Sequence, residues 1–247
     1  LVKASTRGRI TEENIARGIE WVIDNRERFN IRVLNISLGG DQDVACSRSI
    51  INQAAEEAIC QGVVVVAAAG NSGAEGKHSI PPANSPSVIT VGGYDDKNDL
   101  DPGTIDLYHS NFGATADGTV KPEIIAPAIW VAAPLLPGTE QYEQAEALSR
   151  LWATPDYELR RLAGELASRI EIPAQVLNAG GAAIRAFLES LITEQKIIAA
   201  HYQHVDGTSF AAPIVTSIVA QMIEANPGLS PAAIKNILIS TADRIAH

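Results

Sequence analysis

A serine at the start of a long apolar segment is the first candidate for chemistry in this sequence. Ser209 lies in residues 206–213 (DGTSFAAP), and an apolar helix is predicted directly after it. The start of a helix carries partial positive charge and unpaired backbone N–H groups, which suits the stabilisation of a developing oxyanion. A serine there can also simply cap the helix. Ser209 is therefore either a nucleophile or a cap.

Two further segments carry residues suited to binding a peptide. Residues 62–73 (GVVVVAAAGNSG) are typical of a buried strand that ends in small residues and Asn71. The Asn71 carboxamide can donate a hydrogen bond, and the small residues leave room for a substrate side chain; an asparagine here also suits a plain left-handed turn. Residues 35–40 (NISLGG) are either a strand edge that pairs with an extended peptide or a strand followed by a turn.

Alternating helices and short strands must position these segments. Apolar spacing predicts helices over residues 11–28, with Thr11 as the cap, and 43–61. Two later helices are expected, one reaching about Ala225 and one opened by Ser230 and Pro231. Strands are predicted over residues 1–4, 32–38, 63–69, 87–92 and 131–134. Such repeated units predict a layered α/β fold with a mostly parallel sheet.

The composition changes near residue 137. Residues 140–170 and 181–199 are rich in Ala, Leu, Glu and Arg, and prolines and glycines divide them into about three helices. We expect a helical insertion over residues 137–203 within one domain that spans residues 1–247. It is either a structural cap or, over residues 140–199, a module that docks a partner or gates the site.

Charge and hydropathy exclude two classes of partner. With 19 Lys and Arg against 29 Asp and Glu, the net charge is −10, which disfavours a nucleic-acid partner. No apolar run approaches the roughly 20 residues of a membrane-spanning helix, so no membrane partner is expected. The chain is expected to be soluble, and its compartment, secreted or cytoplasmic, stays open.

The two cysteines are not expected to pair. Cys46 and Cys60 fall near opposite ends of the helix predicted over residues 43–61, which separates them by about 21 Å, whereas a disulfide needs Cα atoms within about 7 Å. Two cysteines alone also make a zinc site improbable. We expect both to be small buried residues.

Together, residues 35–40, Asn71 and Ser209 resemble the subtilisin-like serine peptidases, the subtilase family, in order and spacing. Residues 18–21, 82–92 and 121–127 extend the resemblance, which covers residues 1–136 and 203–243. It implies a three-layer subtilisin-like fold, with a mostly parallel sheet flanked by helices and its first strands missing. It also implies a serine endopeptidase that hydrolyses peptide bonds in a peptide or protein substrate.

The resemblance implies a role for each of several residues. Ser209 is the nucleophile and donates to the oxyanion through its backbone N–H, Asn71 is the second donor, and Thr208 supports the oxyanion hole. Ile80 stands where many relatives carry a small residue, which predicts a shallow pocket that disfavours large aromatic side chains. Residues 8–10 would lie across the cleft. The residues expected to line the peptide site are Ser37, Leu38, Gly39, Ala68, Ala69, Gly70 and Ile80.

The resemblance leaves the base and the acid of the triad unassigned. Serine attack needs both, and in subtilases the Asp and then the His precede the Ser. The five histidines, His78, His109, His201, His204 and His247, do not lie in a His-Gly-Thr/Ser-His setting. We expect the Asp and His upstream of Leu1 in a longer parent and negligible activity from this chain alone. No metal or other cofactor is identified, and the family's calcium site would draw mainly on upstream residues.

Two rival functions remain open. A pseudopeptidase would keep the cleft as a peptide-binding or scaffold module without a working triad. A nucleotide-binding α/β domain is the weaker rival, because the sequence has no Gly-x-Gly-x-x-Gly after its first strand and no P-loop.

Overall fold

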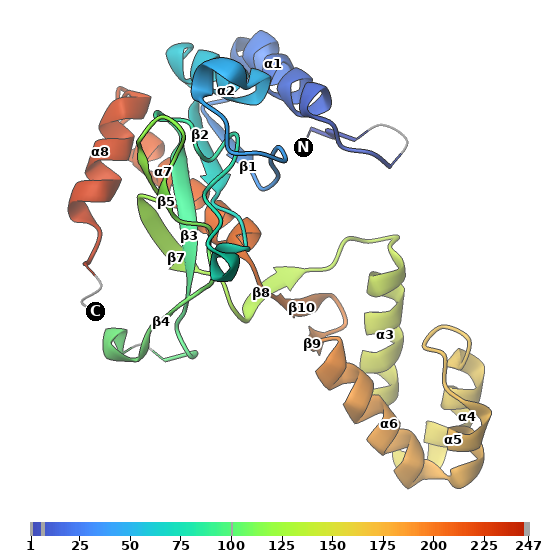
Figure 1. The fold of residues 1–247 in the computed structure, drawn as a ribbon. Helices are drawn as coiled ribbons and strands as arrows, with labels where there is room; N and C mark the ends of the chain where they lie inside the picture. The colour runs from blue at the N-terminus through green and yellow to red at the C-terminus, as the bar shows by residue number, and fades with distance from the viewer. Residues whose placement is uncertain (1, 6–7, 100, 245–247) are drawn as a thin grey trace. The chain divides into compact units, whose positions relative to one another are not determined.

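A five-stranded sheet forms the centre of the part that carries Ser209 (Figure 1). The computed structural model describes residues 2–5, 8–99 and 101–244. Strands β1, β2, β3 and β7 pair in parallel, β2 between β1 and β3, and β7 on β3, whereas β4 is antiparallel to β3. The strands are β1 (Val33–Ile36), β2 (Val64–Ala68), β3 (Ile89–Asp95), β4 (Asp106–Leu107) and β7 (Ile124–Pro127).

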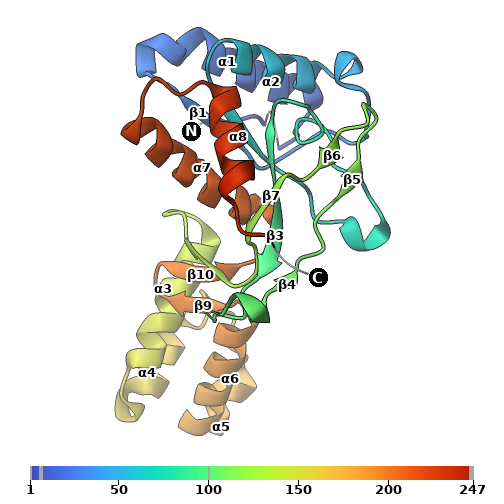
Figure 2. The same cartoon turned by 90° about the vertical axis from the view of Figure 1, so that its left-hand side faces the viewer.

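Helices cover both faces of this sheet, as Figures 1 and 2 show. Side chains alternate along β2, so Val65 packs with α1 (Glu12–Phe29) and α2 (Ile50–Cys60), and Val66 packs with α7 (Thr208–Ala225) and α8 (Pro231–Thr241). A strand buried on both faces is typical of parallel sheets. The predicted three-layer α/β fold is confirmed.

Local signals start α1 and α8 where the sequence predicts. The Thr11 hydroxyl accepts a hydrogen bond from the Asn14 N–H at 3.3 Å, and α1 ends at Asn30, which has a left-handed backbone. Ser230 caps α8 in the same way, with Pro231 in its first turn.

The structure corrects the predictions around the cysteines. Helix α2 begins after Ser49 rather than near residue 43, because Ser49 caps it and Cys46–Arg48 form a separate 3₁₀ turn. The separation of about 21 Å between the two cysteines assumed one continuous helix, and that assumption was wrong because Cys46 lies outside α2. Both thiols are free, but Cys60 is exposed and Cys46 only half-buried, so the prediction of two buried residues was wrong.

The start of the chain differs from prediction as well. Residues 2–4 form no strand. Leu1, the other residue of that predicted strand, lies outside the described residues.

The chain divides into two compact units, Leu1–Ile129 with Asp206–His247, and Trp130–Val205. The second unit has its own core and a three-stranded antiparallel sheet, ordered β8 (Val131–Pro134), β10 (Tyr202–Val205), β9 (Ile197–Ala199). The prediction of about three helices was wrong, since four are described: α3 (Glu140–Ala153), α4 (Asp156–Leu166), α5 (Ala174–Ala179) and α6 (Gly181–Glu194). Strand β9 also replaces the end of the helix predicted over residues 181–199.

Helix α7 is the one helix in the described ranges that is long and apolar enough to cross a membrane. In the structure it packs on the sheet, and Ala211, Val215 and Val219 belong to the core on that face. It is the core helix that places Ser209 at the edge of the sheet.

Candidate active site

Ser209 is half-buried in the first turn of α7. Gly207 precedes the helix with φ +131°, a backbone conformation that favours glycine. In a first turn the N–H groups lack intrahelical partners, so the Ser209 N–H is placed beside its own hydroxyl at the positive end of the helix. The Ser209 hydroxyl therefore lies at the positive, unpaired end of α7.

Thr208 fixes the Asn71 side chain next to Ser209. The Asn71 Oδ1 accepts from the Thr208 N–H at 2.9 Å and from the Thr208 hydroxyl at 3.0 Å. The same hydroxyl accepts from the Gly70 N–H at 3.1 Å, and Thr208 is 0% exposed. Because both described bonds engage Oδ1, the Nδ2 donor of Asn71 stays available for a ligand.

The end of β1 is tied to the same turn. The Ser37 hydroxyl donates to the Ser209 carbonyl oxygen at 3.0 Å and accepts from Asn35 Nδ2 at 3.1 Å. Asn35 in turn accepts from the Thr216 hydroxyl of α7 at 3.0 Å. The sequence pointed to Ser37 only as a cleft residue, and nothing in the local pattern indicated the link to Thr216.

The remaining expected peptide-site residues lie in two neighbouring places. Ala68 is the last residue of β2 and Ala69 and Gly70 follow it; a side chain at Gly70 (φ +104°) would collide with Asn111. Ile80 lies against Gly39, since a Cβ built at Gly39 would meet the Ile80 side chain at 3.4 Å and the Pro81 carbonyl oxygen at 2.7 Å.

The Leu38 side chain faces the core, and residues 8–10, which were expected across the cleft, are exposed to solvent. Leu38 packs against the core beneath α1 and α2, which leaves its backbone rather than its side chain for a peptide. Gly8, Arg9 and Ile10 are exposed.

The histidines serve other contacts. His204 Nδ1 lies 2.7 Å from the Trp130 carbonyl oxygen, the His201 ring stacks on Tyr142, and the His109 ring lies against Tyr108. His78 is exposed and accepts from Asn111 through its carbonyl oxygen. His247 lies outside the described residues.

Charge near the site comes from Asp206. Burial, and then the negative charge of Asp206, raise the pKa of the Tyr108 hydroxyl, which stays neutral at physiological pH. In the described part of the chain, no group of three or more His, Cys, Asp or Glu side chains could hold a metal ion.

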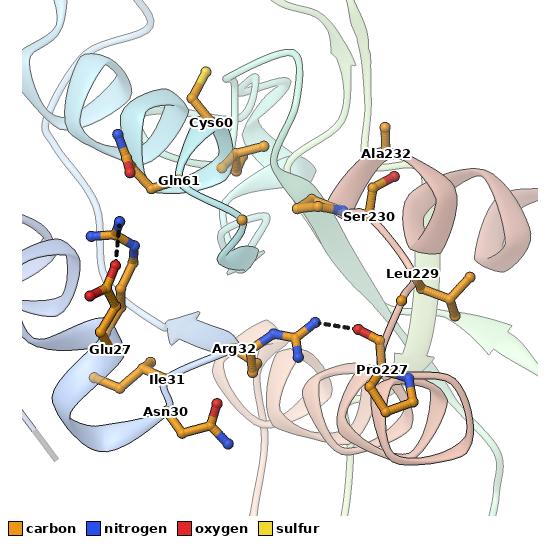
Figure 3. Close-up of a pocket in the computed structure, with 15 residues that line it drawn as sticks. Glu27, Asn30, Ile31, Arg32, Cys60, Gln61, Pro227, Leu229, Ser230 and Ala232 are labelled. Atoms are coloured by element: carbon orange, nitrogen blue, oxygen red, sulfur yellow. Dashed lines mark hydrogen bonds and ion pairs between the residues drawn. The ribbon is translucent and has the colours of Figure 1, made fainter.

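One hollow of this unit is lined by neither Ser209 nor Asn71. It has a volume of about 640 Å³ and lies between the ends of α1 and α2 and the loop before α8, where Arg32 donates to the Pro227 carbonyl oxygen at 2.9 Å (Figure 3). Arg32 precedes β1, so this hollow is at the amino ends of the strands. Parallel sheets bind ligands at the carboxyl ends, which is where Ser37 and Asn71 lie.

Comparison with known proteins agrees with this geometry. The serine protease AprX of Bacillus subtilis is 28% identical over 246 residues, 96% of this chain and 44% of that protein. Subtilisin E of the same organism is 40% identical over 86 residues, 34% of this chain and 20% of its own length. The chain thus spans less than half the length of these relatives.

A solved structure gives the same fold. Sphericase superposes with a TM-score of 0.59 at 21% identity, covering 95% of this chain and 56% of sphericase. The sequence profile of the subtilase family, peptidase S8, matches residues 1–247. The chain therefore belongs to the subtilase family.

Proposed function

We propose that this chain supplies the nucleophile and the oxyanion donors of a serine endopeptidase. The observation that carries the proposal is the pair of hydrogen bonds between the Asn71 carboxamide and Thr208, the residue that directly precedes Ser209 at the start of α7. Membership of the subtilase family and the protease names of its relatives support it.

The chemistry follows from these groups. The Ser209 Oγ attacks the carbonyl carbon of the scissile peptide bond and loses its proton to a base. The oxygen of that carbonyl becomes an oxyanion that accepts hydrogen bonds from the Ser209 N–H and Asn71 Nδ2. The tetrahedral intermediate then collapses and expels the amine, which takes the proton held by the base. Water next adds to the acyl carbonyl carbon as it gives a proton to the base, and the second collapse releases the acid and returns that proton to the Ser209 Oγ. Loss of one oxyanion donor typically costs about 10²–10³ in kcat.

The base and the acid, in this proposal, are a His and an Asp from residues that precede Leu1 in a longer polypeptide. The His201 ring stacks on Tyr142 and His204 Nδ1 lies at the Trp130 carbonyl oxygen, which supports a base from outside the 247 residues. Strand β1 also has room for a neighbour, because among the described residues it pairs with β2 alone. An apolar groove of about 560 Å³ runs beside it, lined by residues such as Ile19 and Trp21.

Such a neighbour would reach the site. A strand parallel to β1 ends at the same edge of the sheet. Its carboxyl end would lie near Ser37, which contacts Ser209.

Substrate recognition is proposed at the ends of β1 and β2. Ser37, Leu38 and Gly39 would pair with an extended peptide, and Ala68–Gly70 would line the pocket before the scissile bond. The Ile80 side chain against Gly39 supports a shallow pocket. Peptides with Leu or Ala before the scissile bond are then cleaved faster than peptides with Phe, and a preference for Phe would contradict this pocket.

Reaction with a fluorophosphonate probe tests the proposed centre. The 247-residue chain is expected to react negligibly, and the chain extended by its own upstream sequence to react at Ser209. Ser209→Ala abolishes labelling, whereas Ser217→Ala, which changes an exposed serine of the same helix, leaves it unchanged. Rapid labelling of the 247-residue chain would refute the external base, and labelling of Ser209→Ala would refute the nucleophile.

A pseudopeptidase is the second candidate. The contacts of His201 and His204 favour it if the longer polypeptide supplies no His and Asp for the triad. The extended chain would then bind peptides at β1 without labelling. Two lesser proposals accompany either function: a structural calcium in the longer polypeptide, and a partner of residues 140–199. Deleting residues 140–199 from the longer polypeptide would leave peptide hydrolysis and its regulation unchanged if that segment is only a cap.

A further inference from the structure

A buried asparagine outside the expected site holds the loop that carries Asn71. Asn111 is 5% exposed. Its backbone N–H donates to the Gly70 carbonyl oxygen at 3.0 Å, and its Oδ1 accepts from the Ser72 N–H at 2.7 Å. Its Nδ2 donates to the His78 carbonyl oxygen at 2.9 Å. One residue therefore binds the loop on both sides of Asn71.

The contact between the two segments leaves little freedom. A Cβ at Gly70 would lie 2.7 Å from Asn111 Nδ2, and a Cβ at Gly73 would lie 1.8 Å from the Ser110 carbonyl oxygen. The Gly73 N–H also donates to the His109 carbonyl oxygen at 3.0 Å. At Gly73 backbone thus packs directly on backbone, and at Gly70 the backbone packs on the Asn111 side chain.

The segment that carries Asn111 is itself fixed to the centre of the sheet. The Ser110 hydroxyl accepts from the Gly93 N–H of β3 at 2.7 Å. The Tyr108 N–H donates to the Gly93 carbonyl oxygen at 3.0 Å. The position of the Asn71 loop is therefore set from β3, through Ser110 and Asn111.

Asn71 is consequently held from two independent directions. Thr208 fixes its carboxamide from α7, whereas Asn111 fixes the peptide groups that flank it. An oxyanion donor must be placed to a fraction of an ångström, because a misplacement of about 1 Å can cost on the order of 10²-fold in rate.

We propose that Asn111 is a positioning residue for the Asn71 oxyanion donor. The proposal rests on the proposed endopeptidase function. Asn111 acts on the reaction through Asn71, and it does not itself meet the substrate.

Kinetics in the upstream-extended chain test the proposal. Asn111→Ala is expected to lower kcat for a chromogenic peptide by about 10-fold to 100-fold, with KM changed by less than about 2-fold. In an Asn71→Ala background, Asn111→Ala is expected to lower kcat by less than about 2-fold, because the donor it positions is gone. Full additivity of the two substitutions would overturn the proposal.

A matched variant separates positioning from general destabilisation. Asn52 is also a buried asparagine, 0% exposed, and its Nδ2 donates to Asn84 at 2.8 Å on the α2 side of the sheet. Asn52→Ala is expected to destabilise the fold without lowering kcat. An equal loss of kcat in Asn52→Ala and Asn111→Ala would also overturn the proposal.

Amide hydrogen exchange gives a readout that needs no activity. In the 247-residue chain, Asn111→Ala is expected to accelerate exchange of the Ser72 amide by more than about 10-fold relative to Asn52→Ala and to shift the Asn71 side-chain NH₂ signals. Unchanged Ser72 exchange and Asn71 signals would refute the positioning role. Absence of peptide hydrolysis with these changes present would instead refute the endopeptidase function alone.

Discussion

At the scale of single residues, the Thr208 hydroxyl joins the start of α7 to the segment that follows β2. It donates to Asn71 and accepts from Gly70. Thr208→Val keeps the branched shape but leaves the Gly70 N–H and one Asn71 lone pair without their partner. We expect the free energy of unfolding to fall by about 1–3 kcal/mol, measured by urea denaturation, and peptide hydrolysis to fall with it.

Thr216 offers the matched control for this change. It lies on the same helix, and its hydroxyl bonds to Asn35 and to the Ala212 carbonyl oxygen. Thr216→Val is expected to cost similar stability with a smaller loss of hydrolysis. Thr208→Ser, which retains the hydroxyl, is expected to stay close to the parent in both. If Thr208→Val and Thr216→Val lowered hydrolysis equally, the Thr208 hydroxyl would have no special part in the site.

The sequence could indicate Ser209, Asn71 and Ser37, because each lies where a predicted strand ends or a predicted helix begins. It could not indicate Asn111, whose side-chain partners Ser72 and His78 lie 39 and 33 residues away in the chain. The link between Asn35 and Thr216 spans 181 residues. Contacts of this kind depend on how strands and helices pack, and local periodicity does not encode them.

At the scale of elements, the same distinction explains which boundaries were predictable. Helices α1 and α8 begin at caps visible in the sequence, Thr11 and Ser230. Helix α2 was predicted too long because residues before it are held by distant partners. Asp43 accepts from Asn84 at 2.8 Å, and the Cys46 N–H donates to Asp117 at 2.6 Å. These bonds satisfy the chain outside a helix, so the apolar spacing there did not become helical.

Glu123 contacts both a buried lysine and a lysine of α8, and the buried lysine gives the fold a pH dependence. Glu123 Oε1 lies 2.6 Å from Lys121 Nζ and 2.5 Å from Lys235 Nζ of α8. Burial, opposed by the charge of Glu123, lowers the pKa of Lys121 from 10.5 to about 8. Between these values the folded state binds fewer protons than the unfolded state, so the free energy of unfolding rises with pH.

Urea denaturation between pH 7 and pH 10.5 measures this rise. We expect Lys121 to raise the free energy of unfolding by on the order of 3 kcal/mol between the two ends of this window. Below about pH 7, Lys121 is protonated in both states, so its effect on stability no longer changes with pH. Lys121→Met removes the contribution, so the stability difference between Lys121→Met and the parent changes with pH. A constant difference across the whole range would contradict the lowered pKa of Lys121.

At the scale of the whole molecule, two compact units that do not share a core predict two unfolding steps. The core of the second unit consists of residues drawn from 147–197, whereas the cores beside the sheet come from the other unit. Leu148, in the core of the second unit, and Val66, in a core beside the sheet, are both 0% exposed. Calorimetry of the 247-residue chain should therefore resolve two transitions.

Substitutions in the two cores assign the transitions. Leu148→Ala leaves a cavity that costs about 2–5 kcal/mol, so it should lower the midpoint of one transition and leave the other in place. Val66→Ala removes fewer atoms from β2 and should lower the other midpoint by less. The fluorophosphonate reaction of the extended chain should follow the transition that Val66→Ala moves, because Ser209 and Asn71 belong to that unit. Equal shifts of both midpoints in either variant would mean that the two cores unfold as one.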